Sequence, residues 1–278
     1  MPNPPTLTPH ERVLVALDAP SLAEALTLVS LLRPHVGGFK VGLELCTAAG
    51  TPRVVAAVAA AGGAIFLDLK LHDIPNTVAG AVRAVCALGP AVRMLTLHCQ
   101  GGAAMLRAAV AAAAGAPHRP LLLGVTVLTS IDEAALRDEL GVAAPLAAHV
   151  LHLAQLARDC GLDGVVASPH EAAAIRGACG PALLLVTPGV RPTWAATGDQ
   201  RRIMTPADAL AAGGDYLVIG RPITAAPDPA AAAARIASEL GRDKASGVGF
   251  QVPGFRIESE RSRKPCVCRN GKAATNQV

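Results

Sequence analysis

Four charged residues that could act together in catalysis lie at the ends of two apolar runs. Asp68 and Lys70 stand two positions apart where the run 64–69 ends, and Asp73 follows three residues later. Side chains two apart on a β-strand point to the same side, so Asp68 and Lys70 share a face. Lys40 lies in the preceding apolar run, 39–43. If the two runs are neighbouring strands, these residues form a row of alternating charge, Lys–Asp–Lys, that Asp73 could extend.

Such a row suits chemistry that passes through a carbanion. An ammonium group fixed between carboxylates stays protonated, can stabilise a developing carbanion and can then protonate it. A carboxylate beside the reacting group would also repel an anionic leaving group in the ground state. Decarboxylation without an electron-sink cofactor would use both effects. The structural alternative is a salt-bridge network that ties two strands together, although several charges gathered at one rim usually indicate function.

The elements that position these residues alternate along the chain between short apolar runs and alanine-rich stretches of helical spacing. Alanine is the strongest helix former, and strands apolar throughout are typical of a parallel sheet buried on both faces. We expect strands at residues 13–17, 39–43, 64–69, 94–97, 121–128, 164–167, 183–186 and 216–219. The expected helices are 21–32, 51–61, 75–88, 102–114, 145–160 and 229–240.

Eight β/α units in about 240 residues match an α/β fold of the (β/α)8, or TIM barrel, type in number and size. A doubly wound open sheet is the competing architecture, but the Gly-x-Gly-x-x-Gly loop usual after its first strand is replaced here by Asp18-Ala19-Pro20-Ser21. We therefore predict an N-terminal extension at 1–10, a catalytic barrel at 11–240 and a basic C-terminal tail at 241–278.

Composition and charge exclude several classes of protein. Hydrophobic residues make up 51% of the 278 residues and charged residues only 17%, which excludes disorder of the main part. Residues 241–278 carry a net charge of +5 and the rest of the chain −1, so the body offers no basic surface for nucleic acid. No apolar run reaches the 18 or so residues of a membrane-spanning helix. The seven scattered cysteines favour reduced thiols in a cytoplasmic protein.

Polar residues gather where a TIM barrel has its active site, at the C-terminal ends of its strands. Six expected strands end in or near such residues, which are Asp18, Lys40, Asp68, Lys70, Thr129, Ser130, Arg191 and Arg221. The loops after strands seven and eight usually bind phosphate. Gly220 leaves room for a phosphate oxygen near the backbone, and Arg221 can bind it bidentately. The long seventh loop carries Gly-Asp-Gln-Arg-Arg at 198–202, and such loops are commonly lids.

The sequence Asp-Leu-Lys-Leu-His-Asp-Ile-Pro-Asn-Thr at 68–77 resembles the signature of the orotidine 5′-phosphate decarboxylase family. Further segments resemble the same family in the right order, at 15–18, 40–42, 125–130, 161–166, 186–191, 198–202 and 218–222. The resemblance covers residues 11–240 and leaves out the tail. It implies a TIM barrel that converts orotidine 5′-phosphate to uridine 5′-phosphate and carbon dioxide in pyrimidine biosynthesis, without a metal or organic cofactor.

The resemblance also implies catalytic roles. Lys70 would be the proton donor to C6 of the pyrimidine, Asp68 would lie beside the substrate carboxylate, and Lys40 would hold Asp68 and contact the ribose. Asp73 would be supplied to the partner subunit's site, which implies a homodimer. The substrate-binding residues that it implies are Asp18, Lys40, Thr77, Thr129, Arg191, Gln200, Gly220 and Arg221.

Several residues and two competing functions stay open. Contributions of Ser130, His98 and Trp194 to the site are undecided, and His72 is interpreted as structural. A related barrel that uses a metal, such as a sugar-phosphate aldolase or epimerase, would share Asp-x-Lys-x-x-Asp but not the continuation at 73–77. A barrel that only binds a nucleotide, or serves as a scaffold, would be expected to lack one of the four charges, and all four are present.

Overall fold

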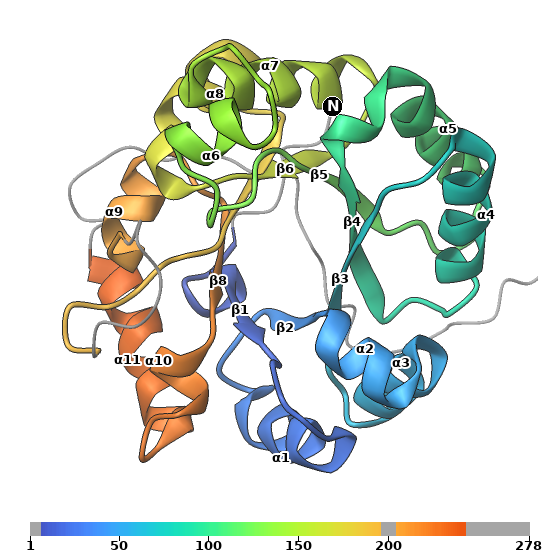
Figure 1. Cartoon of the computed structure of the whole chain (residues 1–278). Coiled ribbons are helices and arrows are strands. Elements are labelled where there is room, and N and C mark those ends of the chain that lie inside the picture. The colour runs from blue at the N-terminus through green and yellow to red at the C-terminus, as the bar shows by residue number, and fades with distance from the viewer. Residues whose placement is uncertain (1–6, 196–203, 243–278) are drawn as a thin grey trace, which may run out of the picture.

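The computed structural model describes residues 7–195 and 204–242. Eight parallel strands follow one another in sequence order and close into a barrel, because β8 pairs with β1. Figure 1 shows the strands in the middle of the molecule with the helices around them, and the blue first unit beside the orange last units. The predicted TIM barrel is confirmed.

All eight expected strands are present, although some begin or end elsewhere than the apolar runs suggest. The strands are β1 (Val13–Ala16), β2 (Gly38–Val41), β3 (Ile65–Leu71), β4 (Val92–His98), β5 (Leu121–Val125), β6 (Gly164–Val166), β7 (Leu184–Thr187) and β8 (Tyr216–Ile219). The prediction that the second strand runs to Leu43 was wrong, because the chain turns at Gly42 and Leu43 begins a helix. The predicted fifth strand, at 121–128, likewise ends three residues early, at Val125.

The six predicted helices form within two residues of their expected bounds, and five others were not expected. The predicted ones are α1 (Leu22–Leu32), α3 (Thr51–Ala60), α4 (Pro75–Cys86), α5 (Gly102–Ala114), α7 (Leu146–Asp159) and α11 (Pro229–Arg242). The others are α2 (Leu43–Ala49), α6 (Glu133–Asp138), α8 (Ala172–Cys179), α9 (Pro206–Ala211) and α10 (Arg221–Thr224). Three-residue 3-10 helices are η1 (His10–Arg12), η2 (Cys99–Gly101) and η3 (Pro169–Glu171). Within the described ranges, no single helix is long and apolar enough to cross a membrane.

Apolar side chains form two layers of core. The larger lies between the strands and the surrounding helices. The smaller fills the barrel interior and includes Leu14, Phe66, Met94, Leu123, Leu184 and Tyr216. Since strand side chains alternate between the two faces, the residues two positions further along also face inward. On β3 and β4 these are polar, Asp68 after Phe66 and Thr96 after Met94, so the interior becomes polar toward the C-terminal ends of the strands.

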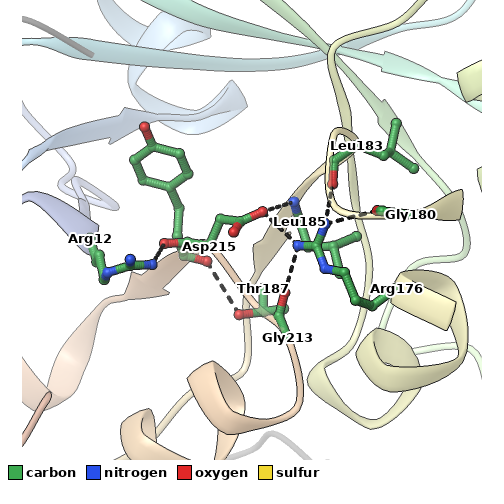
Figure 2. A network of polar contacts seen from close by, with 9 residues as sticks. Arg12, Arg176, Gly180, Leu183, Leu185, Thr187, Gly213 and Asp215 are labelled. Atoms are coloured by element: carbon green, nitrogen blue, oxygen red, sulfur yellow. Dashed lines mark hydrogen bonds and ion pairs between the residues drawn. The ribbon is translucent and has the colours of Figure 1, made fainter. Parts of the chain in front are cut away.

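A buried ion pair connects the N-terminal ends of β7 and β8. The Asp215 carboxylate, only 4% exposed as a residue, accepts hydrogen bonds from the Arg176 guanidinium at 2.7 Å and the Leu185 N–H at 2.8 Å. The same guanidinium donates to the carbonyls of Gly180, Leu183 and Gly213. Figure 2 shows Arg176 reaching all of these groups from α8, with Arg12 donating to the Asp215 carbonyl. This network therefore joins helix α8 to two strand-entry loops.

Replacing Arg176 by methionine should destabilise the barrel. Burial raises the pKa of the Asp215 carboxyl and Arg176 opposes that rise, so without the guanidinium the buried acid loses its main charged partner. Removing one partner of a buried pair typically costs about 3–5 kcal/mol, which equilibrium urea unfolding would measure. The matched control is Arg137→Met on α6, where the pair with Asp138 is exposed and the unfolding midpoint should stay near the wild-type value. Equal midpoints for both variants would contradict this assignment.

Candidate active site

A row of alternating charges crosses the C-terminal rim of the barrel from β1 to β3. The Lys40 ammonium lies 3.0 Å from an Asp18 carboxylate oxygen and 3.8 Å from Oδ2 of Asp68. The Lys70 ammonium lies 2.8 Å from that same Oδ2. The expected Lys–Asp–Lys arrangement is therefore present in the structure, and Asp18 rather than Asp73 is its fourth member.

Burial differs along the row. The side chain of Asp68 is 11% exposed and that of Lys40 is 15% exposed, whereas Lys70 is 30% exposed and Asp18 60%. An ionised carboxylate as enclosed as Asp68 needs charged or hydrogen-bonding partners, and the two ammonium groups supply them. The row thus runs from an open end at Asp18, through a buried centre, to the partly open ammonium of Lys70.

The backbone of β3 is irregular at this place. Leu67 pairs with Leu95 and Leu71 with Leu97, so three residues of β3 lie opposite one residue of β4. Lys70 lies within this bulge and has φ of 50°, the only positive φ at a non-glycine residue in the described part of the chain. Such left-handed conformations cost on the order of 1–3 kcal/mol and are concentrated at active sites. β3 therefore continues past its predicted end at residue 69, but with an irregular ladder.

Thr96, the single residue of β4 opposite the bulge, was missed by the sequence analysis. Its hydroxyl accepts a hydrogen bond from the Lys70 N–H at 2.8 Å and donates one to Oδ1 of Asp68 at 3.0 Å. Thr96 is fully buried. One signal in the sequence could have found it: a polar residue within an apolar strand, two positions after the inward-facing Met94.

Gly42 leaves space for the Lys40 ammonium. A Cβ atom added at this position would lie 3.1 Å from Nζ of Lys40, closer than most real contacts of a Cβ, and 3.8 Å from Asp18. Any larger residue would press on the lysine from the turn that follows β2. The space that the Lys40 ammonium needs therefore explains the glycine in the Lys-Val-Gly sequence at 40–42.

Two histidines stack beside the charge row. The rings of His72 and His98 lie 5.2 Å apart at an interplanar angle of 19°. Burial lowers the pKa of His98, and the nearby His72 and Lys70 lower it further. Nδ1 of His98 is buried, with no hydrogen-bond partner among the described residues. A neutral His98 can stand beside the Lys70 ammonium without adding a second positive charge.

Asp73 does not join the row within its own chain. It is exposed, its carboxylate accepts a hydrogen bond from the Ile74 N–H at 2.6 Å, and no ion pair links it to another described residue. The neighbouring Ile74 side chain is 66% exposed. An acidic residue and a large apolar one thus stand together on the open rim.

The remaining predicted site residues follow other strands at the same rim. Thr129 is half-buried in the turn after β5, and Thr77 is exposed on the first turns of α4. Arg191, after β7, is buried, with its N–H bonded to the carbonyl of Met204 at 2.9 Å. Gly220 and Arg221 begin α10 directly after β8. Gln200, a predicted phosphate ligand, lies outside the described residues.

Trp194, which sequence alone left undecided, packs the loop after β7 against α11. Its indole N–H donates to a Glu239 carboxylate oxygen at 2.9 Å, and the Arg235 guanidinium lies 4.6 Å from the ring centre. Both partners belong to the last helix, so these contacts hold the start of the loop against the barrel. Among the residues that the structure describes, no group of three or more His, Cys, Asp or Glu could hold a metal ion.

Comparison with known proteins assigns the chain to a family. Residues 11–236 match the model of the Orotidine 5′-phosphate decarboxylase / HUMPS family. The chain belongs to this family. A protein of Moorella thermoacetica named orotidine 5′-phosphate decarboxylase is 57% identical over 235 residues, covering 83% of this chain and 92% of that protein. Its namesake in Halorhodospira halophila is 56% identical over 240 residues, covering 86% and 98%.

Solved structures agree with the assignment. The crystal structure of orotidine 5′-phosphate decarboxylase from Lactobacillus acidophilus superposes with a TM-score of 0.73 at 39% sequence identity, covering 82% of this chain and 98% of that one. The family model begins at Glu11 and ends in α11, so it spans the whole decarboxylase-family barrel described above.

The stacked histidine offers a test of the charge on Lys70. Because the Lys70 ammonium lowers the pKa of His98, Lys70→Met should raise that pKa, whereas Lys70→Arg should leave it close to the wild-type value. A pH titration of the His98 ring by NMR, assigned with His98→Asn, measures the shift. A pKa of His98 that stays constant or falls in Lys70→Met would show that the ammonium does not act on the ring.

Proposed function

We propose that this chain decarboxylates orotidine 5′-phosphate to uridine 5′-phosphate and carbon dioxide in pyrimidine biosynthesis. Membership of the decarboxylase family supports the reaction. The observation that carries the mechanism is the Lys70 ammonium 2.8 Å from a nearly buried Asp68 carboxylate, at the barrel rim where active sites of this fold lie. The group that would donate a proton is thus held in place before the substrate arrives.

In the proposed step, the bond between C6 and the carboxylate carbon breaks and its electron pair stays on C6. Carbon dioxide leaves, and the Lys70 ammonium stabilises the developing carbanion and transfers a proton to C6. The neutral amine then recovers a proton from solvent, which restores the ammonium. Asp68 stands beside the substrate carboxylate and holds Lys70. No metal or organic cofactor takes part in this scheme.

The other polar residues of the rim would bind the rest of the substrate. Asp18 and Lys40, joined at 3.0 Å, are proposed to contact the ribose hydroxyls. Thr129 is assigned to the pyrimidine and Thr77 to the binding segment at the start of α4. The proposed phosphate ligands follow β7 and β8 and are Arg191, Gln200, Gly220 and Arg221.

We further propose a homodimer in which Asp73 completes the site of the partner subunit. Asp73 is exposed and forms no ion pair with a described residue of its own chain, and Ile74 exposes two thirds of its surface beside it. An acid next to an exposed apolar side chain fits a subunit interface close to the site. We also place the enzyme in the cytoplasm, since the five cysteines of the described ranges are free thiols, as is usual in reducing compartments.

Lys70→Ala should abolish carbon dioxide release from orotidine 5′-phosphate and leave the fold intact, because it removes the proton donor. Ultraviolet absorbance follows substrate consumption, and circular dichroism checks the fold. Arg53→Ala, which removes an exposed cation from α3, is the control and should turn over like the wild type. The wild type should keep its activity in EDTA, whereas activity lost in EDTA would favour a metal-dependent relative. Substantial turnover by Lys70→Ala would disprove the proposed mechanism.

Mixing inactive chains tests the shared site. In a dimer of Asp73→Ala with Lys70→Ala, one site combines Lys70 of the first chain with Asp73 of the second and is complete. Random pairing of equal amounts makes half of the dimers mixed, each with one complete site, so about one quarter of wild-type activity should return. Each variant alone should stay inactive or nearly so. A mixture that forms heterodimers by mass spectrometry yet gains no activity would refute the shared site.

A further inference from the structure

The β3–β4 ladder places one hydroxyl between the two groups that the mechanism depends on. Residues 68–70 of β3 face the single residue Thr96 on β4, because the register shifts between Leu67 and Leu71. A regular ladder would leave no surplus residue here. The backbone N–H of Lys70 therefore takes a side-chain acceptor, the hydroxyl of Thr96, at 2.8 Å.

The directions of the two hydrogen bonds of Thr96 are fixed by chemistry. A backbone N–H can only donate and an ionised carboxylate can only accept, whereas a hydroxyl does both. The hydroxyl proton therefore goes to Oδ1 of Asp68, at 3.0 Å, and an oxygen lone pair accepts from Lys70. Valine, which has the shape of threonine without the hydroxyl, could form neither bond.

These bonds control both ends of the catalytic ion pair. Thr96 holds Oδ1 of Asp68, which leaves Oδ2 facing the ammonium groups of Lys70 and Lys40. It also binds the backbone of Lys70, whose φ of 50° is unusual for a residue with a side chain. Conformations of this kind persist where the surrounding structure enforces them, and Thr96, itself fully buried, lies directly opposite.

We propose that Thr96 is a positioning residue: its hydroxyl sets the orientation of the Asp68 carboxylate and the backbone conformation from which Lys70 reaches the substrate. This inference rests on the proposed role of Lys70 as proton donor. Thr96 touches neither the substrate nor the transferred proton in this scheme, so its loss should slow the chemical step more than it weakens binding.

The test compares Thr96→Val, Thr96→Ser and a matched control, Thr187→Val. Thr187 is also fully buried, but its hydroxyl donates to the Tyr216 carbonyl on β8. Thr96→Val should lower kcat by about 10- to 100-fold, the cost of slight misplacement of reacting groups, with KM and affinity for uridine 5′-phosphate changed by less than about threefold. Thr96→Ser and Thr187→Val should keep kcat within about threefold of the wild type.

Hydrogen exchange of the Lys70 amide, measured by NMR, gives a readout independent of turnover. The amide should exchange faster in Thr96→Val and at the wild-type rate in Thr187→Val and Thr96→Ser. If Thr96→Val does not fold, Thr96→Ala removes the same hydroxyl without adding bulk and carries the same expectation.

Some outcomes would overturn the role of Thr96 and others the role of Lys70. Wild-type kcat in Thr96→Val, or equal losses of kcat in the valine and serine variants, would reject the positioning role while Lys70→Ala stays inactive. Turnover by Lys70→Ala would instead reject Lys70 as the proton donor. In that case, faster exchange of the Lys70 amide in Thr96→Val would still establish the hydrogen bond from this amide to the Thr96 hydroxyl.

Discussion

The arrangement of the rim depends on the partners of one nearly buried carboxylate, that of Asp68. A charge taken out of water must be compensated by charges and hydrogen bonds of good geometry, and losing one partner is costly. Asp68 has partners from three successive strands: the ammonium of Lys40 on β2, that of Lys70 on β3, and the hydroxyl of Thr96 on β4. Coulomb attraction is stronger at such a site than in water, so the carboxylate holds these three side chains in a fixed arrangement.

The charged groups at the two ends of the barrel differ in what they bind and in how exposed they are. At the N-terminal ends of β7 and β8, Arg176 donates hydrogen bonds to loop carbonyls, and Asp215 accepts one from the Leu185 N–H. This ion pair therefore binds only groups of the chain itself. At the C-terminal rim, the Lys70 side chain is 30% exposed, so its ammonium is accessible from outside the barrel. This agrees with the division of labour in TIM barrels, where one face provides stability and the other carries function.

Local periodicity in the sequence was enough to predict the eight strands and the residues that share a face on them. Strand alternation predicted that Asp68 and Lys70 lie together, and the strand order of a barrel predicted Lys40 next to them; all three meet in the structure. The bulge in β3 was not predictable in this way, because it depends on the register between two strands and leaves no local pattern. Thr96 differs from its apolar strand neighbours in the sequence, but its importance depends on the residues of β3 that lie opposite it. Helix α2 was missed because the apolar run at 39–43 continues past the turn at Gly42.

Both lysines of the row contact Asp68, and their surroundings distinguish them. Lys40 lies between two carboxylates, at 3.0 Å from Asp18 and 3.8 Å from Asp68. In the described part of the chain, Lys70 is paired with Asp68 alone, at 2.8 Å, and is twice as exposed as Lys40. Lys40 is thus bound between two carboxylates, whereas the Lys70 ammonium is the more accessible of the two, as the proposed proton donor requires.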